Sequence, residues 1–379
     1  MRRTVAATLL ASAVLAATAA APAAGAAPST LTQINATPYA LAEGGSFAKY
    51  APRVTALDAK LANAKVADVL ADANRTATAG CHGAASFCWD SGDNSTADWY
   101  PQGLSGSWDA TGGQPKMVLT SWYNKTGDKG VRLTFADYHD PAHVKYRHAL
   151  LVEPTAADNF GPVKVHAGGI ALVGDYLYVV DTAHGLRVFD LRHIWRTAAD
   201  PGKSKIGKQS DGKYYAYDYR YVVAQVGSYR QSGSGDCDPP PSSLTAPLCF
   251  SYIGVDRSTS PPSLLTGEYY NGKAGARLVR WSLAADGKLA TGKAAAAYQS
   301  PHQNLQGAVS YKGEFASSRS QSASKDGVLY DERVGAAATS SSLPPGPEDL
   351  SYDPAAKRVW TLTEHPGSRT VLGVALTLG

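Results

Sequence analysis

The chain carries little charge and has no long apolar run beyond its first segment. Of 379 residues, 36 are Lys or Arg and 32 are Asp or Glu, and charged residues make up only 18% of the whole. The formal net charge of +4 gives no electrostatic reason to expect a nucleic acid or an anionic membrane surface as partner. Past residue 27, no segment approaches the roughly 18 consecutive apolar residues that a transmembrane helix needs. We therefore expect neither a nucleic-acid partner nor membrane insertion.

Several sequence signatures of enzymes are missing. The chain has no H-E-x-x-H, no P-loop, no dinucleotide fingerprint and no Cys–His nucleophile pattern. The nearest approach to G-x-S-x-G is Gly103–Gly106, which lacks the final glycine in register. These absences argue against zincin-type proteases, serine hydrolases of the α/β-hydrolase type and nucleotide-binding enzymes.

The first 27 residues are predicted to form a secretory signal peptide. Arg2 and Arg3 form a short basic start, an apolar and small-residue stretch follows from Val5 to Ala20, and Ala24–Ala27 offers an A-x-A-like cleavage site. No cysteine lies near that site, which argues against a lipoprotein. We expect a secreted, extracellular and monomeric protein.

Only four cysteines are present, and they form two close pairs. Cys81 and Cys88 are separated by six residues, and Cys237 and Cys249 by eleven. In an oxidising compartment each pair most simply closes its own short loop. Metal binding is the alternative, but it lacks a C-x-x-C pattern and a set of nearby histidines. We expect two disulfide bonds.

Residues 28–98 are expected to precede the main domain as an extended arm, an amphipathic helix and a disulfide loop. The helix is predicted over Arg53–Ala73, where apolar residues recur at intervals of three and four. Its apolar positions are Val54, Leu57, Leu61, Val66, Val69 and Leu70. Whether residues 28 to about 75 stay in the mature protein is left open, because a cleavable pro-segment is the alternative.

From Trp99 to the end, short β-patterned segments repeat. Each unit opens with polar residues, continues with a short apolar strand and a turn, and then a second strand follows. The unit after His166 shows this best, with strands predicted at 169–173, 176–181 and 186–190 around a Gly174–Asp175 turn. The openings are at 102–105, 166–170, 250–253, 306–309 and 348–351.

This repeat predicts an all-β fold, a β-propeller of four-stranded antiparallel blades over residues 99–379. We count five blades, and six or seven remain possible if a blade lies within 31–100 or 195–250. The last unit holds only three predicted strands, so a strand from the N-terminal part should complete it and remove an exposed edge. A two-sheet sandwich is the alternative fold.

The opening residues of propeller blades line the central channel, so we expect them to converge at one mouth of it. Such a cluster of amide, imidazole and carboxylate groups could bind Ca²⁺, a sugar or a peptide end. Equally, these groups could only satisfy neighbouring backbone and water. No other cofactor is expected. The candidate ligand-binding residues are Gln102, His166, His302, Gln306, Glu348 and Asp349.

Within this cluster His166 is the most informative residue. A carboxylate from Glu348 or Asp349 across the channel would make it a general base or a metal ligand. Against a glycosidase, the first two openings supply Gln and His, where such enzymes need carboxylates. An oxygen-rich loop with Asp90, Asp93, Asn94 and Asp98, and the pair Asp236 and Asp238, lack EF-hand spacing and are interpreted as turns.

Tyrosine is abundant, with 21 residues. Alternation over 215–221 predicts that Tyr215, Tyr217, Tyr219 and Tyr221 share one strand face, either packed between blades or exposed as a binding surface.

The units that begin with Gln-Gly or His-Ala-Gly-Gly, and the late segment Glu348–Pro354, resemble blades of secreted β-propeller proteins of actinobacteria. The resemblance spans about 99–379. It implies a non-enzymatic protein that acts on an extracellular metalloprotease and is a transglutaminase substrate, with Gln33 as an acyl-donor candidate. We therefore expect a non-catalytic protein that binds an extracellular protein or a cell-wall glycan. An extracellular hydrolase or lyase with its site at the channel mouth is the alternative.

Overall fold

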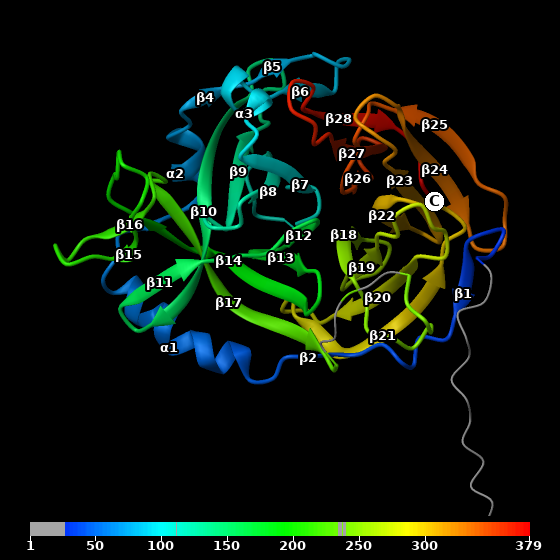
Figure 1. Cartoon of the computed structure of the whole chain (residues 1–379), viewed down its shortest axis with the longest axis horizontal. Coiled ribbons are helices and arrows are strands. Elements are labelled where there is room, and N and C mark those ends of the chain that lie inside the picture. The colour runs from blue at the N-terminus through cyan, green and yellow to red at the C-terminus, as the bar shows by residue number, and fades with distance from the viewer. Residues whose placement is uncertain (1–26, 111, 234–236, 238–239) are drawn as a thin grey trace, which may run out of the picture.

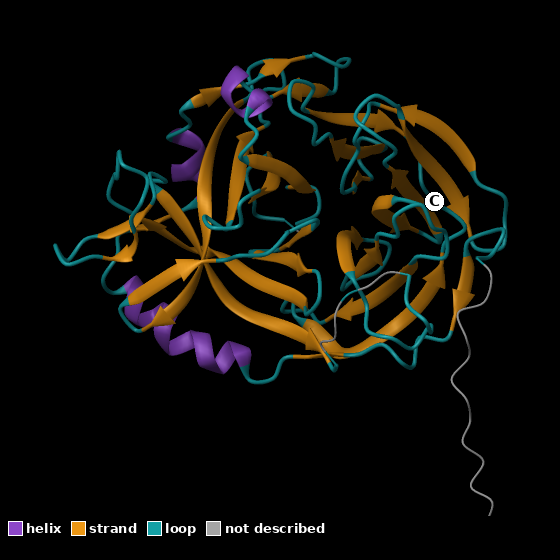
Figure 2. Cartoon of the chain, viewed as in Figure 1, coloured by secondary structure: helices purple, strands orange, loops and turns teal. Residues whose placement is uncertain are grey.

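A computed structural model describes residues 27–110, 112–233, 237 and 240–379. The predicted signal peptide lies outside these residues apart from Ala27. The all-β class is confirmed: strands make up most of the regular structure, and the three helices of the described residues lie at the periphery (Figure 2).

Most strands belong to five antiparallel units that follow one another along the chain. Unit 1 contains β7 (Trp99–Gly106), β8 (Met117–Asn124), β9 (Val131–Asp137) and β10 (Lys145–Ala156), and unit 2 contains β12 (Ile170–Val173), β13 (Tyr176–Asp181), β14 (Gly185–Arg196) and β17 (Tyr221–Gln231). Unit 3 contains β18 (Phe250–Asp256), β19 (Ser263–Glu268), β20 (Arg277–Leu283), β21 (Leu289–Gln299) and β1 (Thr32–Ile34). Unit 4 contains β22 (Leu305–Tyr311), β23 (Glu314–Arg319), β24 (Gly327–Arg333) and β25 (Thr339–Leu343). Unit 5 contains β26 (Ser351–Asp353), β27 (Arg358–Leu362), β28 (Thr370–Ala375), β6 (Ser86–Cys88) and β5 (Thr78–Ala79).

The first strands of the five units, β7, β12, β18, β22 and β26, face one another around the centre of the molecule (Figure 1). At the periphery, β10 and β17 pair in parallel and join units 1 and 2 into one sheet. Shorter strands extend the outer edges or stand apart: β2 (Leu41–Ala42), β3 (Asn63–Ala64), β4 (Arg75–Thr76), β11 (Asn159–Pro162) and the hairpin β15 (Ile206–Lys208) and β16 (Tyr214–Ala216).

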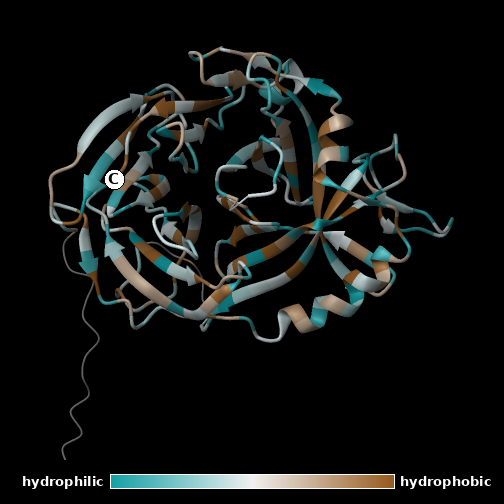
Figure 3. Ribbon diagram, turned by 180° about the vertical axis from the view of Figure 1, so that it is seen from behind, coloured by the Kyte–Doolittle hydropathy of each residue, from teal (hydrophilic) through white to brown (hydrophobic). Residues whose placement is uncertain are grey.

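The apolar core is divided among the contacts between successive units. Leu119 of unit 1 packs with Leu172 of unit 2, and Ala171 on the opposite face of that same strand packs toward unit 3. Further clusters join unit 3 to unit 4, unit 4 to unit 5, and unit 5 back to unit 1, where Trp360 stacks on Trp108. Hydrophobic residues accordingly follow the strands, while the loops are more hydrophilic (Figure 3). Each unit is therefore covered on both faces, and the last one packs against the first.

A strand from the N-terminal part completes the last unit. Strand β6 pairs with β28, with Phe87 opposite Val371, and β5 continues the sheet outward. Strand β1 extends unit 3 in the same manner. Strands of residues 28–98 are thus paired into units 1, 2, 3 and 5 rather than forming a free arm.

The predicted single helix over 53–73 is wrong. The structure has α1 (Ser46–Asp58), which begins seven residues earlier and contains Pro52, and a separate short α2 (Val66–Ala71). Between them β3 pairs with β14, which takes Asn63 and Ala64 out of the helical path. Both helices pack on β10, α1 also on β17 and α2 also on β9, so each keeps one apolar face. A third helix, α3 (Ser91–Ser95), is capped by Asp90, whose side chain accepts a hydrogen bond from the Asp93 N–H.

The tyrosine segment also differs from its prediction. Tyr217 has a φ of 59°, a left-handed conformation that ends β16 and turns the chain toward β17. Tyr215, Tyr217 and Tyr221 are all at most 9% exposed, so they form no exposed binding face. Periodicity alone could not reveal the turn, because nothing in the alternation marks a residue with positive φ.

Both predicted disulfides, Cys81–Cys88 and Cys237–Cys249, are confirmed. In the described ranges, no helix has the length and apolar character needed to cross a bilayer.

Candidate ligand pocket at the centre of the molecule

The strand openings converge because glycines let the inner backbones approach closely. A side chain at Gly169 would place a Cβ only 2.6 Å from the Cα of Tyr252, and one at Gly307 would lie 2.8 Å from the backbone nitrogen of Leu350. Any larger residue would push neighbouring units apart at these points. The repeated Gly of the openings therefore has a structural reason, which is the tight convergence of the first strands.

Asp349 fills the centre of this convergence. Its carboxylate accepts backbone N–H hydrogen bonds from Leu104 at 3.1 Å, from Ile170 at 3.0 Å and from Ile253 at 3.3 Å. These donors belong to the first strands of units 1, 2 and 3, whereas Asp349 precedes the first strand of unit 5. Burial raises the pKa of the Asp349 carboxyl, and the backbone donors oppose that rise. Asp349 is fully buried and ties four units together, so its role in this structure is to hold the fold.

A cavity of about 380 Å³ opens above this centre. Three of the predicted residues line it: Gln102 from unit 1, His166 from the entry to unit 2 and Gln306 from unit 4. The other walls are Thr182, Ser251, Tyr269, Glu364 and the Cys237–Cys249 disulfide, and of these only Ser251 belongs to a predicted unit opening. We call this cavity the central pocket. Its lining offers amide, imidazole, hydroxyl and carboxyl groups together with one aromatic ring.

The two glutamines of the central pocket each donate a hydrogen bond to a glutamate. The Nε2 of Gln306 donates to Glu348 at 3.1 Å, and the Nε2 of Gln102 donates to Glu364 at 3.0 Å. Glu348 is 1% exposed, and burial together with the nearby carboxyl of Glu364 raises the pKa of Glu348 well above its ordinary value.

His166 does not form the expected pair with a carboxylate. In the described part of the chain, its imidazole hydrogen-bonds neither Glu348 nor Asp349. Instead the ring packs on Tyr123, with centroids 4.5 Å apart, and burial lowers the pKa of His166. The residue is therefore neutral at pH 7, and it supplies the pocket with one donor and one acceptor.

His302 lies apart from the other candidates. Its ring stacks on Tyr330 at 3.5 Å, and its Nε2 is 3.2 Å from Glu332, between strands of unit 4. It does not line the central pocket. Among the described residues, no group of three or more His, Cys, Asp or Glu side chains is placed to hold a metal ion, and Asp236 and Asp238 lie outside them.

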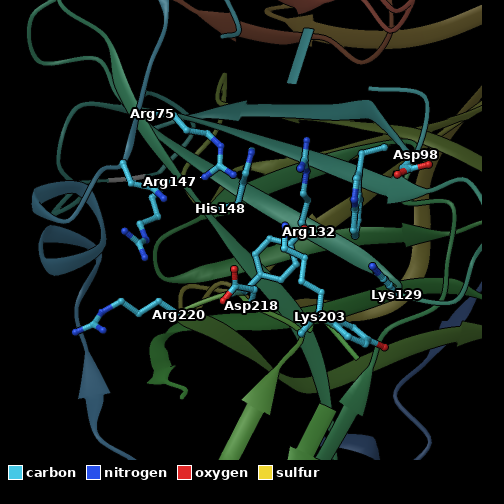
Figure 4. Close-up of a pocket in the computed structure, with 13 residues that line it drawn as sticks. Arg75, Asp98, Lys129, Arg132, Arg147, His148, Lys203, Asp218 and Arg220 are labelled. Carbon is cyan, nitrogen blue, oxygen red and sulfur yellow. Dashed lines mark hydrogen bonds between the residues drawn. The ribbon is translucent and has the colours of Figure 1, made fainter. Parts of the chain in front are cut away.

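A second cavity, of about 260 Å³, lies at the outer side of unit 1 (Figure 4). Sequence reasoning missed it, because its cationic residues come from segments far apart in the chain and no motif joins them. Beneath it is Asp93, which is 5% exposed and accepts hydrogen bonds from Arg132 at 2.8 Å, from His148 at 2.9 Å and from Tyr146 at 2.8 Å. Asp93 is thus an ion-pair partner in the core.

The protonation states beneath this second cavity follow from burial and pairing. Burial lowers the pKa of His148 to about 3, helped by Arg132, so the ring is neutral at pH 7. Its Nδ1 lies 2.7 Å from the hydroxyl of Thr134, which leaves Nε2–H to donate to Asp93. Although burial alone would raise the pKa of Asp93, its cationic and hydrogen-bonding neighbours hold it below the ordinary value.

The geometry defines an all-β protein whose units close on one another and leave a polar pocket at the centre. No protein-family model matches the chain, and no curated protein matches it. A solved structure of hydrazine synthase from Kuenenia stuttgartiensis aligns with it at 12% identity and a TM-score of 0.31, covering 64% of this chain and 70% of that one. A likeness of this strength supports no argument about fold or function.

Proposed function

We propose that the chain is a secreted five-bladed β-propeller that binds a neutral glycan in its central pocket without catalysis. The propeller interpretation is supported by five units whose first strands face the centre, and by apolar clusters that join each unit to the next and the last to the first. The two disulfides fit an extracellular protein.

One observation carries the glycan proposal. Side chains from different units place several kinds of hydrogen-bonding group around one small concave pocket. Gln306 uses one amide donor on Glu348, whereas Gln102 uses both of its donors, on Glu364 and on the Pro101 carbonyl. One donor of Gln306 and the amide oxygens of both glutamines therefore remain for a ligand. The ring of Tyr269 gives a flat amphipathic wall. A ligand rich in hydroxyl groups, each of which donates and accepts, matches this lining better than an ion or an apolar molecule.

The surface gives less support to a protein partner. Specific protein interfaces use a fully buried apolar and aromatic centre. Among the described residues, Val334 is the only large hydrophobic residue that is exposed, at 43%. The tyrosines that could have formed such a centre are buried in the fold.

Two features argue against catalysis in the central pocket. His166 has no carboxylate partner to orient it as a general base. Glu348 is 1% exposed, does not line the central pocket and accepts a hydrogen bond from Gln306, so it is not placed to flank a sugar as the carboxyl groups of a glycosidase do. A hydrolase or lyase at this site is therefore the less favoured proposal.

Isothermal titration calorimetry of the mature protein, residues 28–379, with cellohexaose and with an N-acetylglucosamine hexamer tests the glycan proposal. We expect saturable binding to one of them, weakened at least tenfold by Gln306→Ala. The matched control is Gln321→Ala, a similar change at an exposed site of unit 4 outside the pocket, which should leave affinity within twofold. Binding that Gln306→Ala leaves unchanged, or no binding of either oligosaccharide, contradicts the proposal. Shortened sugars in the titrated sample would favour the hydrolase.

The resemblance to secreted propellers such as the dispase autolysis-inducing protein supports a further partner, an extracellular protease or a transglutaminase. Gln33 lies exposed in β1, the outermost strand of unit 3. If it is an acyl donor, microbial transglutaminase should incorporate an amine probe into the wild type, and Gln33→Asn should lose most of the label. Equal labelling of the two proteins would remove Gln33 from consideration.

A further inference from the structure

The second cavity is enclosed by three parts of the chain that are distant in sequence. Its floor is the outer face of unit 1, with Trp99 and Arg132. One wall is the segment around β4, and the other is formed by Lys203 and the turn 217–220 between β16 and β17. In Figure 4, Arg147 and Arg220 approach from one side, and Asp98 and Lys129 from the other. We call this cavity the basic pocket.

Cationic side chains dominate its lining. Six arginines and lysines line the basic pocket, against two carboxylates, Asp98 and Asp218. The cations are Arg75, Lys129, Arg132, Arg147, Lys203 and Arg220.

The guanidinium groups share their carboxylate partners. Arg75 and Arg132 are both paired with Asp93, at 3.1 and 2.8 Å, and Arg75 also lies 3.9 Å from Asp90. On the other side, Arg147 and Arg220 both use Asp72, at 3.4 and 3.2 Å. When one carboxylate serves two guanidinium groups, several N–H donors remain for a further anion.

The two lysines of the basic pocket add positive charge without forming ion pairs of their own. Within the part of the chain that is described, neither the Lys129 nor the Lys203 ammonium group forms an ion pair. With the partner carboxylates included, six positive charges meet five negative ones around the cavity. The pocket therefore keeps a small positive surplus and, through Asp98 and Asp218, two carboxylates able to accept hydrogen bonds.

Arg132 marks the site as built rather than incidental. It is only 4% exposed, and its guanidinium lies against the rings of Trp99, at 4.9 Å, and Trp122, at 4.3 Å. Its Nε has no hydrogen-bond partner. Arg132 is therefore a buried cation whose hydrogen-bonding capacity the described residues do not fully use.

The backbone around the pocket is strained at two residues. Tyr217 and Lys203 have φ values of 59° and 52°, in the left-handed region that side-chain-bearing residues seldom adopt. The N–H of Tyr217 bonds to the carbonyl of Lys205 at 2.7 Å and keeps the turn in place. Strain of this kind gathers at ligand sites, where the surrounding structure holds it. Here it directs Tyr217 and Lys203 toward the cavity.

We infer that the basic pocket binds an acidic saccharide, through a carboxylate or phosphate group held by the arginines and a sugar ring held against the aromatic side chains. Arginine forks match both anionic groups. Asp98 and Asp218 accept from sugar hydroxyls, and Trp99, Tyr217 and Tyr219 supply flat walls. A volume of about 260 Å³ exceeds what an isolated anion fills and suits an anion attached to a small polar body. This site is separate from the central pocket.

Isothermal titration calorimetry of residues 28–379 with tri-galacturonic acid, glucose 6-phosphate and neutral maltotriose tests the inference. At least one acidic probe should bind, more weakly at 300 than at 50 mM NaCl because the attraction is ionic. The acid that binds more tightly identifies the anionic group. The neutral sugar should bind at least tenfold more weakly than that acid.

The variant Lys203→Gln/Arg220→Gln removes two rim cations without touching the buried Arg132–Asp93 pair. It should weaken binding of the acidic probe at least tenfold. The control Lys312→Gln/Lys325→Gln makes the same charge change at exposed residues of unit 4 and should stay within twofold of the wild type. Gln306→Ala, in the central pocket, should also stay within twofold, so failure of one site is distinguishable from failure of the other. No binding of either acid, equal binding of maltotriose, or equal losses in the two double variants overturns the inference.

Discussion

Asp109 offers the sharpest prediction about stability. It is 1% exposed, and its Oδ2 accepts hydrogen bonds from the hydroxyls of Ser105 and Ser351, each at 2.6 Å, and from the Gly106 N–H at 3.3 Å. Its Oδ1 has no partner. Burial raises the pKa of Asp109 from 3.8 to about 6, although these hydrogen bonds oppose the rise. The carboxyl links the first strands of units 1 and 5, where the fold closes.

The sign of the effect follows from linkage. The folded state holds the proton more tightly than the unfolded state, so the stabilising contribution of Asp109 is complete below about pH 4 and is lost as the pH rises through about 6. A shift of about two pKa units at about 1.4 kcal/mol per unit corresponds to about 3 kcal/mol. Asp109→Asn does not titrate and so lacks this loss.

Urea unfolding of Asp109→Asn and wild type, followed by tryptophan fluorescence at pH 4, 5, 6 and 7.5, measures the contribution. The free energy of unfolding of the variant minus that of the wild type should rise by about 3 kcal/mol from pH 4 to pH 7.5. Taking this difference cancels the titration of all other groups. Ser105→Ala removes a bond that lowers the pKa, and should move the transition to higher pH. A difference that stays constant within 0.5 kcal/mol over this range would refute the reasoning.

Three further variants test other parts of the fold. Asp349→Ala leaves three buried N–H groups without an acceptor and should lower the free energy of unfolding by at least about 3 kcal/mol. Asp349→Asn should lower it by less than half as much. Equal losses in the two variants would contradict the central role of that carboxylate. Lys357→Gly, at an exposed turn with φ of 50°, should raise the free energy of unfolding by about 0.5–1 kcal/mol, whereas Lys357→Ala should not. Cys81→Ser/Cys88→Ser frees the loop that leads into β6 and should lower the free energy of unfolding, measured in urea, by about 2 kcal/mol. A loss under about 0.5 kcal/mol would show that strand pairing alone holds unit 5 closed.

Local patterns in the sequence predicted the strands well. The strand over Tyr176–Asp181 has the predicted bounds, because alternation and the Gly174–Asp175 turn are both set by neighbouring residues. The break between α1 and α2 could not be predicted, since it depends on Asn63 and Ala64 pairing with a strand about 130 residues later. Long-range pairing overrode the local helical spacing.

The central pocket was predicted in part, because the repeat is visible in the sequence. The repeat placed Gln102, His166 and Gln306 at equivalent positions, and the structure brings these three to one pocket. Tyr269 and Glu364 occupy no repeated position and could be found only from the folded structure. The basic pocket could not be predicted, because its cations come from β4, β9 and β10, from the turn between β8 and β9, and from the insertion between β14 and β17.

The most direct test of the central claim is a crystal structure of residues 28–379 soaked with the neutral oligosaccharide that binds in calorimetry. We expect a sugar ring against Tyr269, with its hydroxyls hydrogen-bonded to Gln102 and Gln306. A sugar bound elsewhere on the molecule, with the central pocket left without it, would contradict the account.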